Sequence, residues 1–253
     1  MSIREPVVAG TFYPAEKDVL EELIAGFLKT VPSRTLGGKL KALIVPHAGY
    51  SYSGQVAAHA YALLQTRTIG KRNVVLLGPS HFVPFGGVAA DTHEQWKTPL
   101  GTVSLAQSTF PAMEEAHRTE HCLEVQLPFL QKTLSSFTIT PLVTGDAQPH
   151  EIAEKLRPLM DTSLFIISSD LSHYHDYATA VSNDKVTIDA ILRLDNDALR
   201  GKGEACGMIP ILTALELAQE LKWKRTLLEY KNSGDVSGYK KEVVGYASIA
   251  FYQ

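Results

Sequence analysis

The stretch KALIVPHAGYSYSG, residues 41–54, carries the pattern that decides the fold. Its first half is a short apolar run rich in β-branched residues, which is typical of a buried strand. Pro46 ends this run, because proline has no backbone N–H with which to continue a sheet ladder, and His47 follows at once. Helical periodicity begins near residue 53. The stretch therefore predicts a core strand, a turn that carries a histidine, and then a helix.

The same alternation of strand and helix continues along most of the chain. The expected strands cover residues 42–46, 73–78, 87–91, 137–145, 163–170, 224–232 and 243–253. The expected helices cover residues 18–31, 53–65, 120–132, 149–160, 178–194 and 207–221. Alternation of this kind is typical of α/β folds, so we expect a single domain with a central mixed, largely parallel sheet flanked by helices. The last two strands are expected to pair in antiparallel fashion at an edge.

Composition narrows the class of protein. The chain has 253 residues, of which 45% are hydrophobic and 20% charged, as in ordinary globular domains. Because the net charge is −3 and no basic run is present, we expect no nucleic-acid or membrane partner. Two cysteines do not make a disulfide framework, and no signal-like or membrane-spanning apolar stretch occurs. We therefore expect a cytoplasmic location.

Histidines follow three of the expected core strands. His47, His81 and His173 each lie just beyond such a strand, and Asp170 precedes His173. The carboxyl ends of parallel strands meet at one edge of a sheet, where ligands bind in open α/β folds. A single loop histidine is usually an ordinary solvated residue, but three of them in equivalent places favour a shared pocket.

Cys206 is the candidate that could complete this pocket. It lies in a glycine-rich segment just before the expected helix 207–221, where the helix N-terminus would favour a thiolate. Two hypotheses remain open from the residues alone. The histidines and the cysteine could ligate Zn, Cu or Fe. Alternatively, Cys206 could be the nucleophile of a thiol-dependent hydrolase, with His173 as base and Asp170 as the orienting acid.

The sequence makes weaker predictions about the positions of the other titratable residues. Glu120 and His121 are expected at the start of an amphipathic helix, from which they could reach the same pocket. Cys122 is expected in the core, the usual place of a free cysteine. Three histidines in polar surroundings are expected at the surface: His93, His117 and His150.

Eight motifs, in order along the chain, resemble the Memo family. They are AGTFYP (9–14), PHAGYSYSG (46–54), LGPSH (77–81), TPLG (98–101), EHCLEVQLPFL (120–130), SSDLSHY (168–174), CGMIP (206–210) and NSGDVSG with VVGYASI (232–249). This resemblance covers nearly the whole chain. It implies a fold similar to that of class III extradiol dioxygenases, which hold non-haem Fe(II) with two histidines and a carboxylate.

The resemblance also implies a ligand set. It places His47, His81 and Cys206 as ligands of Fe(II) or Cu, with Zn possible, and it places His173 as an acid–base group beside Asp170. A thiolate in place of the dioxygenase carboxylate is a softer donor that suits redox metals, so ring cleavage does not carry over with the fold. We therefore expect a non-haem iron or copper redox enzyme that acts on an unknown small molecule.

Further implications concern the pocket and its partners. Glu120, His121 and Tyr50 are expected around the ligands or in the substrate pocket. An AMMECR1-type protein and a radical SAM enzyme, the other members of the AmmeMemoRadiSam set, are implied associates. Adaptor-like relatives imply an alternative, in which the same cleft binds a phosphopeptide without turnover. Tyr50, Tyr52 and Trp96 are the aromatic residues that could line such a cleft.

Overall fold

A computed structural model of the chain describes residues 2–65 and 72–253. Its strands are β1 (Ile3–Arg4), β2 (Leu40–Val45), β3 (Arg72–Pro79), β4 (Val88–Ala90), β5 (Gln95–Thr98), β6 (Gly101–Ser104), β7 (Phe137–Thr144), β8 (Ser163–Ser168), β9 (His173–His175), β10 (Lys224–Asn232) and β11 (Val243–Tyr252). Its α-helices are α1 (Lys17–Thr30), α2 (Tyr50–Gln65), α3 (Glu114–Arg118), α4 (Leu127–Thr133), α5 (Pro149–Leu156), α6 (Tyr177–Arg193), α7 (Asn196–Lys202), α8 (Met208–Glu220) and α9 (Ser233–Ser237). Two 3-10 helices are η1 (Glu124–Gln126) and η2 (Arg157–Leu159).

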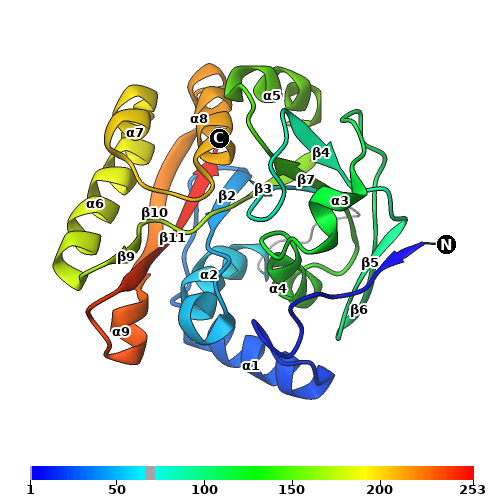
Figure 1. The fold of residues 1–253 in the computed structure, drawn as a ribbon, viewed down its shortest axis with the longest axis horizontal. Coiled ribbons are helices and arrows are strands. Elements are labelled where there is room, and N and C mark those ends of the chain that lie inside the picture. Colours follow the sequence, from blue (N-terminus) through cyan, green and yellow to red (C-terminus); the bar gives the residue numbers. More distant parts are fainter. Residues whose placement is uncertain (1, 66–71) are drawn as a thin grey trace.

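The central sheet runs in the order β10-β11-β2-β8-β3-β7-β4, and β9 pairs with β11 (Figure 1). Its four middle strands are parallel, whereas β10, β11 and β9 on one side and β4 on the other are antiparallel to their neighbours. This arrangement confirms the mixed α/β sheet and the antiparallel pairing of the last two strands. The parallel part is narrower than expected, because β4 pairs with β7 in antiparallel fashion.

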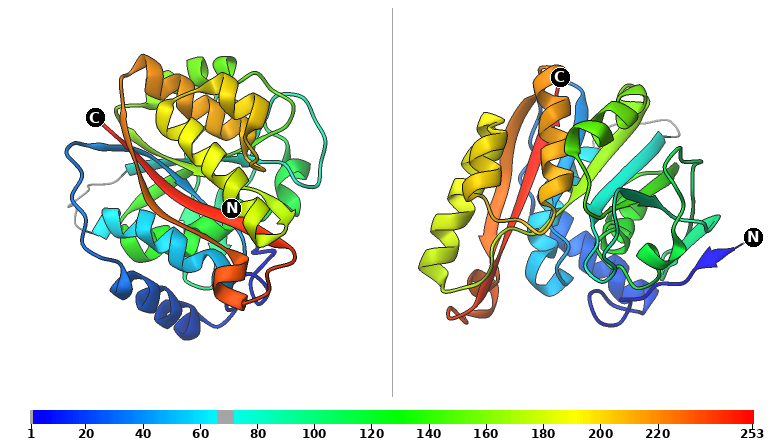
Figure 2. Two further views of the ribbon diagram at one scale, coloured as in Figure 1. Left: turned by 90° about the vertical axis from the view of Figure 1, so that its left-hand side faces the viewer. Right: turned by 45° about the horizontal axis from the view of Figure 1, so that its top comes forward.

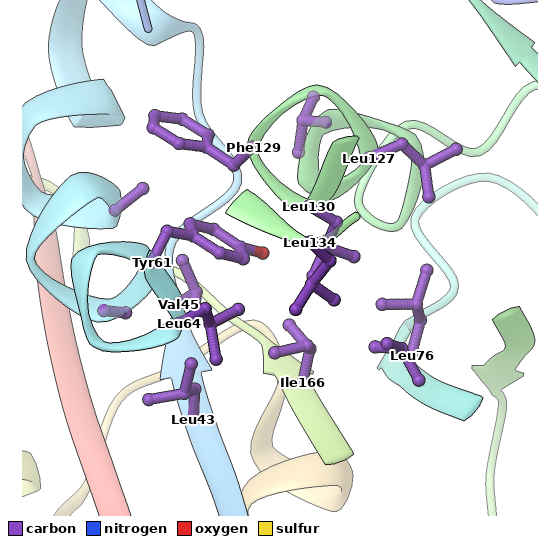
Figure 3. Close-up of a cluster of buried hydrophobic side chains, with 14 of the residues drawn as sticks. Leu43, Val45, Tyr61, Leu64, Leu76, Leu127, Phe129, Leu130, Leu134 and Ile166 are labelled. Atoms are coloured by element: carbon purple, nitrogen blue, oxygen red, sulfur yellow. The ribbon is translucent and has the colours of Figure 1, made fainter. Parts of the chain in front are cut away.

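Both faces of the sheet are buried, as the continuous apolar runs of the middle strands require. On one face, Leu43 and Val45 of β2 join a cluster with side chains of α1, α2 and α4 (Figure 3). On the other face, Ala42 and Ile44 pack with side chains of α5 and α8. The helices therefore form a layer on each side of the sheet, which Figure 2 shows from two further directions. Each fully buried aliphatic side chain contributes about 1.5–3 kcal/mol to this packing.

The sequence does not anticipate several short elements. Strands β1, β5 and β6 form a separate small sheet, and β9 is an added edge strand. The helix expected over residues 120–132 begins later, because the chain turns through residues 121–123 before η1 and α4. Glu120 takes part in that turn, since its carboxylate accepts the backbone N–H groups of His121 and Cys122. Glu120 and His121 therefore lie in a loop, and the expectation of a helix start there is wrong.

The helices of the structure are too short or too polar to cross a bilayer. Among residues 2–65 and 72–253, none contains a sufficiently apolar stretch of the required length.

Candidate metal centre

The candidate centre lies at the carboxyl edge of the parallel strands. Strands β2, β8 and β3 are neighbours, and they lead directly into His47, Asp170 and His81. Their registers align the strand ends, since Val45 is opposite Ser168. The sequence prediction that these side chains meet at one edge is therefore confirmed.

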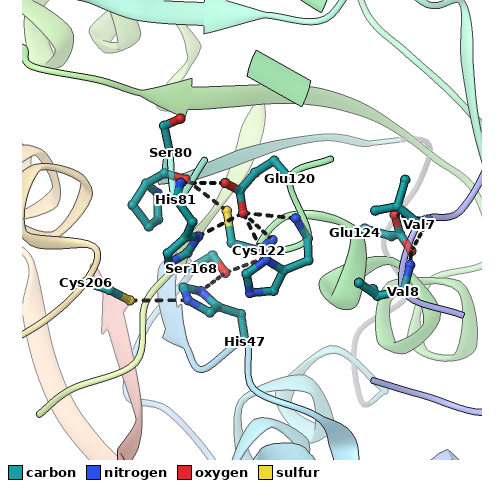
Figure 4. A network of polar contacts seen from close by, with 12 residues as sticks. Val7, Val8, His47, Ser80, His81, Glu120, Cys122, Glu124, Ser168 and Cys206 are labelled. Carbon is teal, nitrogen blue, oxygen red and sulfur yellow. Dashed lines mark hydrogen bonds and ion pairs between the residues drawn. The ribbon is translucent and has the colours of Figure 1, made fainter. Parts of the chain in front are cut away.

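Three side chains come close enough to share an ion. One ligand atom each from His47, His81 and Cys206 lies within 4.8 Å of the others. His47 Nε2 lies 3.2 Å from Cys206 Sγ (Figure 4). This separation is shorter than the sum of one metal–nitrogen and one metal–sulfur bond, about 4.3 Å, so both atoms can contact one ion. The cluster can therefore hold a metal ion.

A cavity of about 470 Å³ opens onto the cluster. Its walls include six of the residues expected from the sequence, namely His47, His81, His121, Asp170, His173 and Cys206. The cavity wall also includes three aromatic residues that the sequence analysis did not indicate: Phe12, Tyr174 and Tyr246. Their contribution depends on long-range packing, because Phe12 belongs to the N-terminal segment and Tyr246 to β11. A second cavity, of about 430 Å³, also reaches Cys206, and Met208 and Ile209 form part of its walls.

His47 is held deep in the protein. Its backbone N–H donates to Asp170 Oδ1 at 2.8 Å, and its Nδ1 lies 3.0 Å from Ser168 Oγ. Burial, reinforced by the neighbouring His81, lowers the pKa of His47 to about 3. The imidazole is therefore neutral at physiological pH, and the neutral ring is the form that ligates a metal.

His81 is oriented by a carboxylate. Its Nδ1 lies 2.9 Å from Glu120 Oε1, and its backbone N–H donates to Glu120 Oε2 at 2.7 Å. Burial acts to raise the pKa of Glu120, but the hydrogen bonds and charge of His81 outweigh it and lower that pKa to about 2. A carboxylate that holds the far nitrogen of a ligating histidine is a common feature of metal sites.

His121 lies against both candidate histidine ligands. Its ring centroid is 4.8 Å from that of His81 and 5.5 Å from that of His47. Burial and the nearby His47 lower the pKa of His121 to about 4, so this ring is also neutral at physiological pH. The structure thus brings His121 into the pocket although it lies in a loop.

Cys206 differs from the expectation in one respect. Its Sγ accepts the backbone N–H of Asp170 at 3.2 Å. Burial and the nearby Asp170 carboxyl raise the pKa of the Cys206 thiol to about 12, so the expected stabilisation of a thiolate by the helix start is wrong. The residue lies before Gly207, the N-cap of α8, whose backbone N–H acts to lower the pKa of the Cys206 thiol, but burial outweighs it. A bound cation would reverse this balance, since an opposite charge favours the thiolate.

Asp170 follows β8 and His173 begins β9, and both line the cavity. The Asp170 carboxylate accepts from the His47 backbone, and burial raises the pKa of this carboxyl. His173 is in β9, which pairs with β11. Between His173 and His175, Tyr174 has a φ of 62°, which is rare for a residue with a side chain. This backbone conformation leaves Tyr174 exposed at the rim of the cavity.

Several other sequence expectations are settled by burial. Tyr50 is buried and donates its hydroxyl to Val125 O at 2.6 Å, outside the described walls of the cavity. Trp96 is 1% exposed and stacks under Arg4, so the proposal that it lines the cleft is wrong. His117 is also fully buried, and its Nε2 pairs with Ala89 O. The prediction that His117 lies at the surface is therefore wrong. Cys122 is in the core, as expected.

The predictions of surface exposure for the two remaining histidines have different outcomes. His93 is only partly exposed, because its ring is bonded to the Asp91 carboxylate, so its surface expectation holds only in part. His150 is exposed on α5, as expected.

Sequence comparison identifies relatives of this chain. The model of the family described as Memo-like protein matches residues 4–250. The chain belongs to the Memo family. A MEMO1 family protein of Methanosarcina acetivorans is 38% identical, over 98% of this chain and 99% of its own. MEMO1 family proteins of Aquifex aeolicus and Thermoplasma acidophilum are 35% and 34% identical, over at least 97% of both chains. The motifs that indicated the Memo family thus include the residues that form the cluster.

Proposed function

We propose that this Memo family protein is a redox enzyme that holds iron or copper with His47, His81 and Cys206. The observation that carries the proposal is the convergence of His47, His81 and Cys206 on a cavity of about 470 Å³. Two imidazoles and a thiolate form a soft donor set that suits Cu and Fe, and also Zn. The cavity, which is open to solvent, provides room for a small molecule next to the metal.

The protein's own side chains fit this set of donors. Glu120 and Ser168 each contact the Nδ1 atom of one histidine, which leaves each Nε2 atom available to the cluster. The Asp170 backbone N–H supports the Cys206 sulfur. When bound, the metal would supply a redox-active centre, and the protein would supply a pocket beside it.

His173 is the candidate acid–base group of this proposal. It lies in the cavity wall but outside the cluster of three ligands. His173 can therefore exchange a proton with a bound small molecule while the three proposed ligands hold the metal. His173→Gln should keep the metal content of the wild type and lose turnover.

The two alternatives have less support. A thiol-dependent hydrolase needs a reactive Cys206 thiolate, whereas burial raises the pKa of this thiol to about 12. The phosphopeptide-binding alternative depended on Tyr50, Tyr52 and Trp96, of which Tyr50 and Trp96 are buried. The redox-metal proposal is therefore the one that the site geometry favours.

Metal analysis of anaerobically purified protein tests the proposal. The wild type should contain close to one Fe or Cu per chain after loading, and Cys206→Ser should contain far less. Cys122→Ser is the matched control, because it changes a cysteine that donates to Pro79 O in the core. Equal metal content in the wild type and Cys206→Ser would rule the site out. If only Cys122→Ser loses metal, the ion binds instead at a second cluster that could hold one, formed by His81, Glu120 and Cys122.

A second measurement addresses the redox role. Voltammetry of the copper-loaded or iron-loaded protein should give a reversible one-electron wave that the zinc-loaded protein lacks. Absence of such a wave in protein with full metal content would contradict the redox part of the proposal.

Other expectations stay predictions. These are the dioxygenase-like relationship of the fold, the identity of the metal and the small-molecule substrate. The cytoplasmic location and the association with an AMMECR1-type protein and a radical SAM enzyme stay predictions as well.

A further inference from the structure

The hydroxyl of Ser168 is the meeting point of a buried hydrogen-bond network next to His47. Its Oγ lies 2.6 Å from Cys122 O, 2.8 Å from Gln126 Nε2 and 3.0 Å from His47 Nδ1. Figure 4 shows Ser168 beside Cys122 and His47. Ser168, Gln126 and His47 are at most 2% exposed. The three contacts therefore have to satisfy the hydroxyl without help from bulk water.

Counting donors and acceptors assigns each contact. A serine hydroxyl has one hydrogen to donate and two lone pairs with which to accept. The carbonyl oxygen of Cys122 can only accept, so the Ser168 hydrogen goes to it. One lone pair of Ser168 is filled by an N–H of Gln126. Only one lone pair remains for His47 Nδ1, and that nitrogen must carry a hydrogen to use it.

The orientation of Gln126 is fixed independently. Its Nε2 also donates to Pro46 O at 3.0 Å, and a carbonyl oxygen can only accept. Its Oε1 accepts from the hydroxyl of Tyr61 at 2.7 Å. Exchanging the amide oxygen and nitrogen would lose these bonds, so the N–H group that faces Ser168 is firmly assigned.

We propose that Ser168 is a positioning residue that fixes His47 as the Nδ1–H tautomer, with the Nε2 lone pair directed at the metal cluster. A neutral imidazole carries hydrogen on one nitrogen only, so an Nδ1–H leaves Nε2 free to ligate. His47 Nε2 is the atom that lies 3.2 Å from Cys206 Sγ. The benefit for metal binding rests on the proposed function, whereas the tautomer itself does not.

His81 reaches the same arrangement by different chemistry. Its Nδ1 faces Glu120 Oε1, and an ionised carboxylate can only accept, so His81 also carries hydrogen on Nδ1. Glu120 fixes His81 with a charge, whereas Ser168 fixes His47 with a neutral hydroxyl. The two ligands can therefore be perturbed separately, which makes Ser168 a clean target.

Imidazole ¹⁵N spectroscopy of the metal-free protein tests the tautomer directly. The His47 signals are assigned by their loss in His47→Gln. In the wild type, Nδ1 should show the shift of a protonated ring nitrogen and Nε2 that of an unprotonated one. Ser168→Ala should yield a mixture of tautomers or a switch to Nε2–H. A wild-type His47 in the Nε2–H form, or an unchanged tautomer in folded Ser168→Ala, would overturn the proposal.

Zinc affinity, measured by chelator competition, is the second readout. Ser168→Ala should bind Zn(II) about 10–100-fold more weakly than the wild type. Ser248→Ala is the matched control, because Ser248 is a fully buried serine whose hydroxyl donates to Val56 O and not to a histidine. Equal losses in both variants would overturn the specific role of Ser168. If the wild type binds no zinc, the proposed metal site fails, while the wild-type spectrum still decides the tautomer.

Discussion

Gly245 marks the closest approach between the strand and the helix that support the pocket wall. It exchanges backbone hydrogen bonds with the segment after β8, through Leu171 N–H to its carbonyl and its own N–H to Ser172 O. A side chain at Gly245 would overlap the carboxylate of Asp184 in α6. Only glycine therefore lets β11 and α6 hold the loop that carries Asp170 and His173.

Gly245→Ala should lower the free energy of unfolding by about 1–3 kcal/mol, because the added methyl group overpacks a filled space. Urea unfolding measures this change. Gly26→Ala in α1 is the control, since no other group lies near a methyl group built there. That change should stabilise the protein by about 0.5–1 kcal/mol, because alanine is the better helix residue. Equal effects of the two substitutions would contradict the role of close approach.

Asp91 provides a residue-scale test that depends on pH. Its carboxylate accepts from the rings of His93 and Trp96. Burial acts to raise the pKa of Asp91, but these hydrogen bonds outweigh it and hold the pKa below its usual value. The resulting stabilisation is complete above the unfolded pKa, about 3.9, and is lost as the pH falls through the lower folded pKa.

Asp91→Asn should therefore reduce the free energy of unfolding by about 1–3 kcal/mol at pH 7. The difference from the wild type should shrink as the pH falls below about 4, because the Asp91 carboxylate of the unfolded chain takes up a proton before that of the folded chain. Unfolding curves between pH 3 and pH 7 check this. A difference that stays constant across the range would show that the charge of Asp91 is not the cause.

The residues of the site were predictable where they depend on strand ends. His47 and His81 follow apolar runs that end at proline or close to it, and parallel strands bring such ends together. Phe12 and Tyr246 were not predictable, because they reach the cavity through pairings distant in sequence. The burial that keeps the Cys206 thiol protonated could not be predicted either, because the glycine-rich segment before Cys206 suggests an exposed residue.

At the scale of elements, the N-terminal segment is attached to the site by a buried ion pair. Arg4 Nη1 lies 2.7 Å from Glu124 Oε2, and both side chains are nearly inaccessible. Arg4 also donates to Glu120 O at 2.6 Å, next to the carboxylate that orients His81. Glu124 in turn accepts from Val7 N–H and the Tyr13 hydroxyl. The ion pair therefore holds the segment that delivers Phe12 to the cavity.

Arg4→Met should lower the free energy of unfolding by about 3–5 kcal/mol, because it leaves the charge of Glu124 buried without its partner. Glu124→Gln combined with Arg4→Met should recover part of that loss, because the double variant buries no unpaired charge. A double-mutant cycle in urea measures the coupling between the two residues. Additive losses would indicate that Arg4 acts through its stacking on Trp96 and not through the ion pair.

The elements with a strong apolar pattern were predicted closely, and the others were missed. Residues 137–145 and 163–170 were expected as strands, and β7 and β8 occupy most of both ranges. Strand β9 was missed because it is short, polar and defined by pairing with β11. Strands β1, β5 and β6 were missed for a similar reason, since their small sheet depends on long-range pairing and shows no long apolar run.

For the whole molecule, the cluster joins segments that are far apart in the chain. The proposed ligands come from the loops after β2 and β3 and from the segment before α8, and the cavity wall extends from Phe12 to Tyr246. The middle strands that lead to the site form the core of one continuous sheet. An ion that binds these ligands should therefore stabilise the folded chain as a unit.

Zinc, as a redox-inert probe, should raise the midpoint of thermal unfolding. At a free concentration 100 times the Kd, binding to the folded state alone contributes about 2.7 kcal/mol. For a chain of this size, that free energy corresponds to a rise of roughly 5–10 °C in the midpoint. Any binding of zinc to the unfolded chain would make the rise smaller. Calorimetry should show one transition that moves as a whole in the wild type and in His150→Ala, whose histidine is exposed. Cys206→Ser should show little shift. An equal shift in Cys206→Ser would place the zinc elsewhere, and two transitions with only one moving would contradict coupling through a single domain.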